Sequence, residues 1–507
     1  MTYGSDDNYK TGAILFILIY SVIWITVSSN LDPAVPYDAV ESLNWANSLE
    51  FGSPKNPYIV GAMTAIGLLI NPLINLALYW YISHFTVIAV GLWGIFLLSR
   101  RLFGNNKVAF FAMLSLNLSG VINFDIISYN DNYLLVMLWP YLFLFFVKSI
   151  YDNKAYWYAL AVVCGLAAMS KYSTFAFFPF MLIYAFSTKK GRESCNSKEF
   201  YLSLLLFLLI ITPNIFWLYQ HDFAAFNWVD SQINAGLNSK VLVSALVVFY
   251  PIIIIILLLK TLKATLVAPD SDEKKAVLFV FTPPLILIFG YFLFNSGGRI
   301  TEWLQPFTVL SPVIALCFLN VERVKSWRGI NLSLLIVAAA VCLGYATVLY
   351  KDIRGAGSKF NYIQPLSAEI NQIWRDKYQV PLRYVGGGYF SQWLTFYAPD
   401  RPLIAERWSN HEKPNLYTPN ISEKEIVQAG GLFLSSLNST CQDADFQHVL
   451  RAFPDLPISE MDDYVFVTRQ GKEMKWCLAF VAPAEQSSQQ TIHIDSAQGY
   501  TVEKSHR

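Results

Sequence analysis

The sequence has few charges, few cysteines and no internal repeat. Only 14% of its 507 residues are Asp, Glu, Lys or Arg, whereas a soluble domain has about 25%. The net charge is +1 and no basic patch stands out, which argues against nucleic acid as a partner. The six cysteines include no pair with metal-site spacing such as CxxC. What the chain has instead is 54% hydrophobic and 16% aromatic residues, and these define its class.

Apolar runs fill the first 350 residues and predict a polytopic α-helical membrane domain over 1–350. A span needs about 20 apolar residues, or fewer where neighbouring helices cover it, so we expect about 11 spans. The runs 156–170 and 172–187 are short and separated by little more than Lys171, so they form either a tight hairpin or one element with a break. The first run lacks a cleavage site and a strongly basic start, so we expect a retained helix. The runs lie at 13–28, 79–98, 107–122, 133–147, 156–170, 172–187, 200–219, 241–259, 276–294, 304–319 and 330–350.

Residues 351–507 have ordinary charge and no long apolar run, which predicts a small soluble α/β domain. Segments 360–378 and 443–453 have the periodicity of helices. This part of the chain contains Cys441 and Cys477, which could form one disulfide if the domain lies outside the cytoplasm. Four stretches predict strands, at 401–406, 430–436, 464–469 and 475–482.

Lys and Arg are concentrated in alternate loops. With the N-terminus in the cytoplasm, the inner loops contain nearly all of these residues, as the positive-inside rule requires. Only Lys55, Lys171, Lys240 and Arg299 fall on the outer side. An odd number of spans then places residues 351–507 outside. Merging 156–187 into one span would break the alternation of the later loops, so the hairpin is favoured.

The first outer loop, within residues 30–78, is acidic. The stretch LDPAVPYDAVESLNWANSLEFGSPKNPY begins at Leu31, and Asp38 in it precedes an apolar-periodic run that predicts a surface helix over 39–49. A carboxylate beside a low-dielectric boundary can act as a general base. However, Asp38 as N-cap with Glu41 at the third helical position also fits a capping box. Spacing alone favours this structural role.

Each of the outer cations, and His221, has two possible roles. Lys55, Lys171 and Arg299 either reach towards headgroups or bind a lipid phosphate, which Arg299 can contact in bidentate fashion. Two prolines flank Lys55 and predict an extended, rigid stretch. His221 and Asp222 could form an acid/base pair or half of a metal site, but adjacent helical residues point apart and no second His is near in sequence.

Several segments, taken in order, resemble the membrane-embedded GT-C glycosyltransferases that use polyprenyl-phosphate sugars. The likeness is to the bacterial glycosyltransferase family 39-like group, relatives of protein O-mannosyltransferases and of the lipid A aminoarabinose transferase. It covers most of the chain, and although each motif is degenerate, the ordered set is fairly specific. The segments are YDAVESLNWANSLEFGSPKNPY, SYNDNYLLVMLWPYLFLFF, CGLAAMSKYSTFAFFP, PNIFWLYQHDFAAFNW, TEWLQPFTVLSP and QWLTFYAPDRP.

The resemblance implies roles for three residues. Asp38 matches the acidic position that acts as catalytic base, Lys55 matches the lysine that contacts the donor phosphate or its carrier, and Asp131 matches a second acidic position. The chain departs from the pattern twice. The typical Asp-Glu pair is Asp38–Ala39 here, which leaves open whether Asp38 or Glu41 does the chemistry. The typical Lys-Pro-Pro is Lys55–Asn56–Pro57, which weakens the assignment of Lys55.

We therefore expect a glycosyltransferase of the bacterial inner membrane with a cytoplasmic N-terminus and a periplasmic C-terminal domain. It would transfer a sugar from a polyprenyl-phosphate donor to a lipid or cell-envelope glycan acceptor. The donor phosphate is expected to contact Lys55, Arg299 and Lys171, and the membrane lipids are further partners.

Acceptor positioning is assigned to Asp131, His221 and Glu302. No cofactor is assigned with certainty, and a divalent metal stays an open alternative that the sequence does not favour. The rival hypothesis is a transporter or flippase for a lipid-linked sugar. Transporters often place ionisable residues inside spans and use inverted repeats, whereas these spans contain almost no charge and the sequence shows no repeat.

Overall fold

The chain forms two compact units in the computed structural model. One unit, the helical unit, contains Met1–Asp32 and Leu49–Ile353, and the other, the α/β unit, contains Pro33–Ser48 and Arg354–Arg507. A short piece of the first outer loop thus belongs with the C-terminal part of the chain. The described residues are 3–48, 50–71, 73–128, 130–297, 300–324, 326–351, 362–388, 390–405, 421–451, 453, 455–467, 471 and 473–484.

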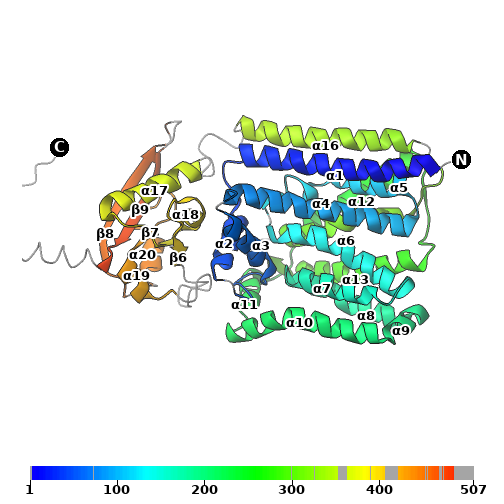
Figure 1. Cartoon of the computed structure of the whole chain (residues 1–507), viewed down its shortest axis with the longest axis horizontal. Helices are drawn as coiled ribbons and strands as arrows, with labels where there is room; N and C mark the ends of the chain where they lie inside the picture. The colour runs from blue at the N-terminus through cyan, green and yellow to red at the C-terminus, as the bar shows by residue number, and fades with distance from the viewer. Residues whose placement is uncertain are drawn as a thin grey trace, which may run out of the picture. The chain divides into compact units, whose positions relative to one another are not determined.

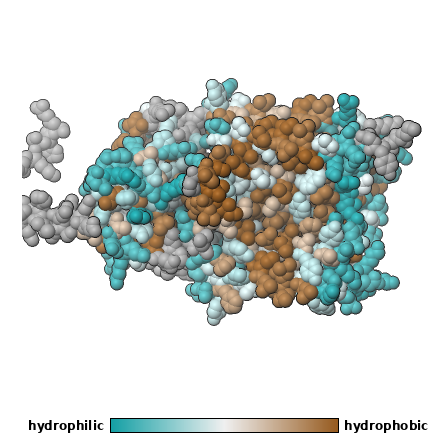
Figure 2. Space-filling view, viewed as in Figure 1, coloured by the Kyte–Doolittle hydropathy of each residue, from teal (hydrophilic) through white to brown (hydrophobic). Residues whose placement is uncertain are grey.

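The helical unit is a bundle of apolar helices (Figure 1). Within the described ranges, seven helices are long and apolar enough to cross a membrane, or eight if the bent helix α12 (Lys240–Thr261) counts as one span. Their outward residues are apolar, for example Leu18 and Val22, and Figure 2 shows such side chains covering much of the bundle's flank. The seven are α1 (Tyr3–Leu31), α4 (Leu76–Phe103), α6 (Asn130–Tyr151), α10 (Lys198–Gln220), α13 (Asp272–Leu293), α16 (Trp327–Tyr350) and the composite segment Ile300–Cys317.

The other predicted runs form shorter helices, so the number of 11 spans stays a prediction. They are α5 (Asn106–Ser115), α7 (Tyr156–Ala168) and α8 (Phe178–Ser187). The hairpin at Lys171 is confirmed, because Trp157 Nε1 at the start of α7 donates to Ser194 Oγ at 2.8 Å, and Ser194 lies on α9 (Lys189–Cys195) just beyond α8. The loop 30–78 also contains an apolar helix that the sequence analysis did not separate, α3 (Ile59–Ile70).

Two segments of the bundle are discontinuous. One continues α5 with the 3₁₀ turns η1 (Leu116–Leu118), η2 (Gly120–Ile122) and η3 (Ile126–Ser128), and the other is α14 (Ile300–Leu304), η5 (Gln305–Leu310) and α15 (Ser311–Cys317). Every residue of η5 is buried. Irregular backbone at membrane depth is tolerated where protein surrounds it. These breaks bring Asp125 and Gln305 together inside the bundle.

Short elements complete the helical unit at its two ends. Figure 1 shows α3 and α11 (Ala224–Ser231) at one end and α9 at the other. At the α9 end, Arg101 joins α4 to Asp152 at 2.5 Å and to Glu273 of α13 at 2.6 Å. The other elements are η4 (Tyr172–Phe177) and two antiparallel pairs, β1 (Ile233–Ala235) with β3 (Asn295–Gly297) and β2 (Thr265–Leu266) with β4 (Leu319–Asn320).

The α/β unit contains a five-stranded sheet with the order β6-β5-β7-β9-β8. Strands β6, β5 and β7 are parallel, and β7, β9 and β8 pair antiparallel. The strands are β5 (Tyr384–Gly387), β6 (Leu403–Ile404), β7 (Gly431–Leu434), β8 (Ile458–Val467) and β9 (Glu473–Val481). The helices are α2 (Tyr37–Ser48), α17 (Ile363–Tyr378), α18 (Ser391–Tyr397), α19 (Glu423–Ala429) and α20 (Ala444–Arg451).

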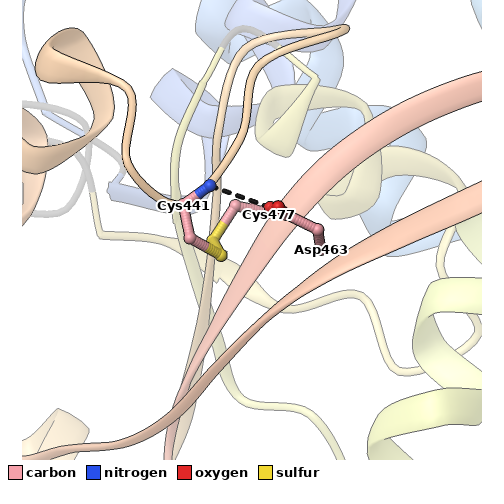
Figure 3. A group of neighbouring side chains, drawn as sticks. All are labelled: Cys441, Asp463 and Cys477. Carbon is pink, nitrogen blue, oxygen red and sulfur yellow. Dashed lines mark hydrogen bonds between the residues drawn. A yellow bond between two sulfur atoms is a disulfide. The ribbon is translucent and has the colours of Figure 1, made fainter.

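The predicted α/β class is confirmed, as are the four predicted strands and both predicted helices. Strand β5 was missed because its sequence, YVGG, has low strand propensity. Its glycine is required by the packing, since Gly387 has φ +98° and a Cβ there would lie 2.2 Å from Leu434 O. The disulfide that the sequence left open between Cys441 and Cys477 is present (Figure 3).

Asp400 fixes the chain between α18 and β6. Its carboxylate accepts hydrogen bonds from Arg375 Nε at 3.0 Å, Asn371 Nδ2 at 3.0 Å and Leu382 N at 2.8 Å. Burial alone would raise the pKa of this carboxyl, but these donors outweigh burial and lower the pKa below its ordinary value. The ionised form therefore stabilises the folded unit.

Asp400→Asn is expected to destabilise the α/β unit by roughly 1–3 kcal/mol at pH 7, because buried donors lose a charged acceptor. A lowered carboxyl pKa gives stability that is present above the unfolded-state pKa of about 4 and is lost as the pH falls through the folded-state value. The difference from wild type should thus shrink below about pH 4. Hydrogen exchange of the 363–387 peptides in the full chain measures it, with exposed Asp376→Asn as the control. Equal exchange in Asp400→Asn and wild type would contradict the assignment.

Candidate functional site

Lys55 lies on a tight hairpin and not on the extended stretch that the flanking prolines predict, so that prediction is wrong. Gly52 and Pro57 form an antiparallel bridge, and Ser53 N donates to Asn56 O at 2.9 Å. The two prolines are accommodated on either side of this turn. The hairpin holds the half-buried Lys55 with its Nζ 5.4 Å from the ring centroid of Trp228 on α11, a cation–π contact.

The hairpin is packed against the end of α10. A Cβ on Gly52 would lie 2.2 Å from the indole of Trp217, so only glycine allows this approach. Trp217 Nε1 donates to Glu50 Oε2 at 2.6 Å. The ring of His221 stacks on that indole at 4.2 Å, and its Nε2 lies 3.9 Å from the same Glu50 oxygen. Glu50 therefore lies beside both the Trp217 and the His221 rings.

Lys171 starts a chain of hydrogen bonds into the bundle. Its Nζ donates to Asn132 Oδ1 at 2.6 Å, and Asn132 Nδ2 donates to Gln305 Oε1 at 2.9 Å. Gln305 Nε2 then donates to Asp125 Oδ2 at 2.6 Å. The two amides in series therefore connect a positive group at one end of the chain of bonds to a carboxylate at the other. Asn132 is 0% and Gln305 3% exposed, so these bonds form away from water.

Two further hydrogen bonds connect Lys171's segment to the Lys55 hairpin. Tyr172 OH, next to Lys171 along the chain, donates to Asn214 Oδ1 at 3.0 Å, and Asn214 Nδ2 donates to Phe51 O at 2.7 Å. The structure thus brings Lys55, Lys171 and His221 into one connected polar region of the helical unit. This is the α11 end of the bundle in Figure 1.

The remaining predicted site residues, on the acceptor side and at Arg299, are only partly described by the structure. Glu302 lies on α14, where its backbone oxygen accepts from Asn132 Nδ2 at 2.9 Å, so it adjoins the Lys171 chain. Asp131 lies in the first turn of α6, beside Asn132, and its side chain is outside the described part of the structure. Arg299 also lies outside the described residues. Their predicted roles stay predictions.

Asp38 and Glu41 lie on α2, which belongs to the α/β unit. Helix α2 begins at Tyr37, and Pro36 O accepts from Ala39 N at 3.1 Å, so Asp38 is in the first turn and is not the N-cap. A carboxylate there still interacts favourably with the helix dipole. Asp38 is partly exposed, whereas Glu41 is 2% exposed. Exposure favours Asp38 for contact with a substrate.

Three side chains have atoms close enough to hold a metal ion in the described ranges, namely Cys441, Asp463 and Cys477. The two sulfurs form the disulfide in Figure 3, and Asp463 Oδ1 accepts from Cys441 N at 2.8 Å. Thiolate ligands are therefore not available, and this group is a structural crosslink.

Sequence reasoning missed the two amides that link Lys171 to Asp125. Asn132 and Gln305 are neutral and far apart in the sequence, so neither charge nor periodicity singles them out. Their one signal is location, because both lie in segments that the family resemblance picks out, SYNDNY and TEWLQP.

A bundle of membrane-length helices with polar side chains gathered at one end, together with a separate α/β unit, defines a multi-pass membrane protein. Comparison with known proteins agrees with this class. Residues 55–217, which include Lys55 and Lys171, match the model of the PMT_2 family, dolichyl-phosphate-mannose-protein mannosyltransferase.

The fold is similar to that of ArnT from Cupriavidus metallidurans. In the crystal structure of ArnT bound to undecaprenyl phosphate, the match covers 92% of this chain and 97% of that chain, with a TM-score of 0.59 and 14% identity. For ArnT in the apo state, the match covers 94% and 98%, with a TM-score of 0.58 and 12% identity. No curated protein matches the chain by sequence. The resemblance to GT-C glycosyltransferases is thereby confirmed.

Proposed function

We propose that the protein transfers a sugar from a polyprenyl-phosphate donor to a lipid or cell-envelope glycan acceptor. The observation that carries this proposal is the fold shared along 92% of the chain with ArnT bound to undecaprenyl phosphate. The cationic groups at the α11 end of the helical unit provide the chemistry that a phosphate-linked donor requires. Lys55 and Lys171 are held there by defined neighbours.

In this reaction Asp38 accepts the proton of the acceptor hydroxyl as its oxygen attacks the anomeric carbon. The bond between that carbon and the carrier phosphate breaks, and polyprenyl phosphate leaves with the additional negative charge. Lys55, Lys171 and Arg299 stabilise that charge. Because phosphate is a good leaving group, a second carboxylic acid is not obligatory. Glu41 is the alternative base.

Asp131, His221 and Glu302 complete the proposal as the groups that orient the acceptor. For His221 the contact with Glu50 supports a fixed ring orientation, with Nδ1 2.8 Å from Trp217 O. For Glu302 the proximity to Asn132 supports a place beside the donor phosphate.

The reaction is assigned to the periplasmic face of the inner membrane, with residues 351–507 as a periplasmic domain. The disulfide between Cys441 and Cys477 supports this side, since such bonds persist in oxidising compartments. The concentration of Lys and Arg in alternate loops supports the same orientation.

The purified full chain is expected to release free undecaprenyl phosphate from an undecaprenyl-phosphate sugar when an acceptor lipid is present. The experiment offers a panel of sugars on this carrier in detergent and in sealed vesicles and measures both sugar transfer and movement of the donor across the bilayer. Transfer that requires the acceptor supports the proposal. Movement across the vesicle without transfer of any sugar would instead establish the transporter hypothesis.

A further inference from the structure

Helix α2 is fastened to a helix that follows it by about 350 residues in the sequence. The backbone of Val35, just before α2, is bound on both sides by side chains of α18. Val35 N donates to Tyr397 OH at 2.7 Å, and Trp393 Nε1 donates to Val35 O at 3.2 Å. Buried backbone groups need such partners, so α18 provides bonds that the N-terminal segment cannot make by itself.

A second attachment lies in the C-terminal half of α2. Asn44 Nδ2 donates to Gln392 Oε1 at 2.6 Å, and these residues are 0% and 1% exposed. Between the two attachments the ring of Tyr37 meets that of Trp393 edge-on, with centroids 5.5 Å apart. Contacts with α18 therefore hold the chain on both sides of Asp38.

The α2 helix depends on these contacts for its orientation. It has 12 residues, and isolated helices of that length are marginal in water. Pro33 and Pro36 precede it, so no preceding helix extends into α2 and aligns it. Tertiary packing must supply the orientation, and α18 is the partner that the hydrogen bonds identify.

Helix α18 is itself rigidly placed. It follows β5, whose Gly387 is pressed against β7, and it is followed by Asp400, which binds Asn371 and Leu382 N. The sheet therefore fixes the position of α18, and α18 in turn fixes the position of α2.

We infer that Tyr397, Trp393 and Gln392 are positioning residues that act through Asp38, so that the α/β unit sets the alignment of the base. The inference rests on the proposed function, in which Asp38 is the base. A catalytic group displaced by about 1 Å can lose about 10²-fold in rate. Loosening one attachment of α2 should therefore lower turnover without weakening the donor contacts in the helical unit.

Tyr397→Phe keeps the ring and removes the hydroxyl that Val35 N binds. In the full chain, kcat is expected to fall about tenfold while KM for the undecaprenyl-phosphate sugar stays within about twofold. In an Asp38→Asn background the same change should have no further effect, because residues that act through one another are not additive. Tyr464→Phe, on strand β8 of the same unit, is the matched control and should match wild type.

Hydrogen exchange of the full chain gives a readout that does not depend on activity. Amides of residues 37–48 should exchange faster in Tyr397→Phe than in Tyr464→Phe, while those of β7 and β9 stay unchanged. Wild-type kcat in Tyr397→Phe, or an equal slowing in the Asp38→Asn background, would overturn the inference. A wild type that transfers no sugar refutes the proposed function instead, and unchanged exchange of 37–48 refutes the attachment of α2 by itself.

Discussion

Asp38→Asn is expected to lower kcat for sugar transfer by about 10²–10⁴-fold, the range by which a positioned general base contributes to catalysis. Asn keeps the size of the side chain but cannot accept a proton. KM for the undecaprenyl-phosphate donor should change little, since the donor phosphate is assigned to lysines of the helical unit. Steady-state kinetics on the purified full chain measures both constants.

Two companion variants make this result interpretable. Asp376→Asn changes an exposed Asp on α17 of the same unit and should leave kcat unchanged. Glu41→Gln tests the alternative base that the missing Asp-Glu pair leaves open. If Glu41→Gln is inactive and Asp38→Asn transfers at the wild-type rate, the base is Glu41, and the lower exposure of that side chain was a poor guide.

The sequence was most informative where long-range context matters least. Long apolar runs form helices wherever they occur, because a backbone in lipid must satisfy its own hydrogen bonds. The strands with several β-branched and aromatic residues, such as β8, were likewise predicted. The disulfide could be proposed from Cys441 and Cys477 but not established, because only the fold brings them together.

The sequence was least informative where distant segments meet. The partner of α2 could not be predicted, since Gln392 and Trp393 are ordinary helix residues until α18 is placed. The hairpin at Lys55 was read as extended because its turn depends on Gly52 packing against Trp217. The prediction that Asp38 is the N-cap was wrong because the helix begins one residue earlier, at Tyr37. Spacing predicts local geometry, and packing decides the rest.

Lys171→Met is expected to lower kcat/KM for the donor by about 10²-fold, because it removes a cation from the charge that develops on the leaving phosphate. Met retains most of the stem's length and apolar contacts. The loss should appear in kcat and in direct binding of undecaprenyl phosphate, since the phosphate is charged both before and after transfer. Native mass spectrometry of the full chain measures the binding.

Lys240→Met is the matched control, since Lys240 is an exposed cation at the start of α12 and belongs to no part of the proposed site. It should alter binding and turnover by less than about twofold, as screened surface charges do.

Lys171→Met also has a structural effect. Asn132 Oδ1 accepts a hydrogen bond from Lys171 Nζ in the wild type and loses it in this variant, so some destabilisation is expected. Lys171→Arg separates the two effects, because it restores the positive charge with a different shape. Binding that recovers in Lys171→Arg supports the phosphate contact. Wild-type binding in Lys171→Met would show that the chain from Lys171 to Asp125 serves the fold of the bundle alone.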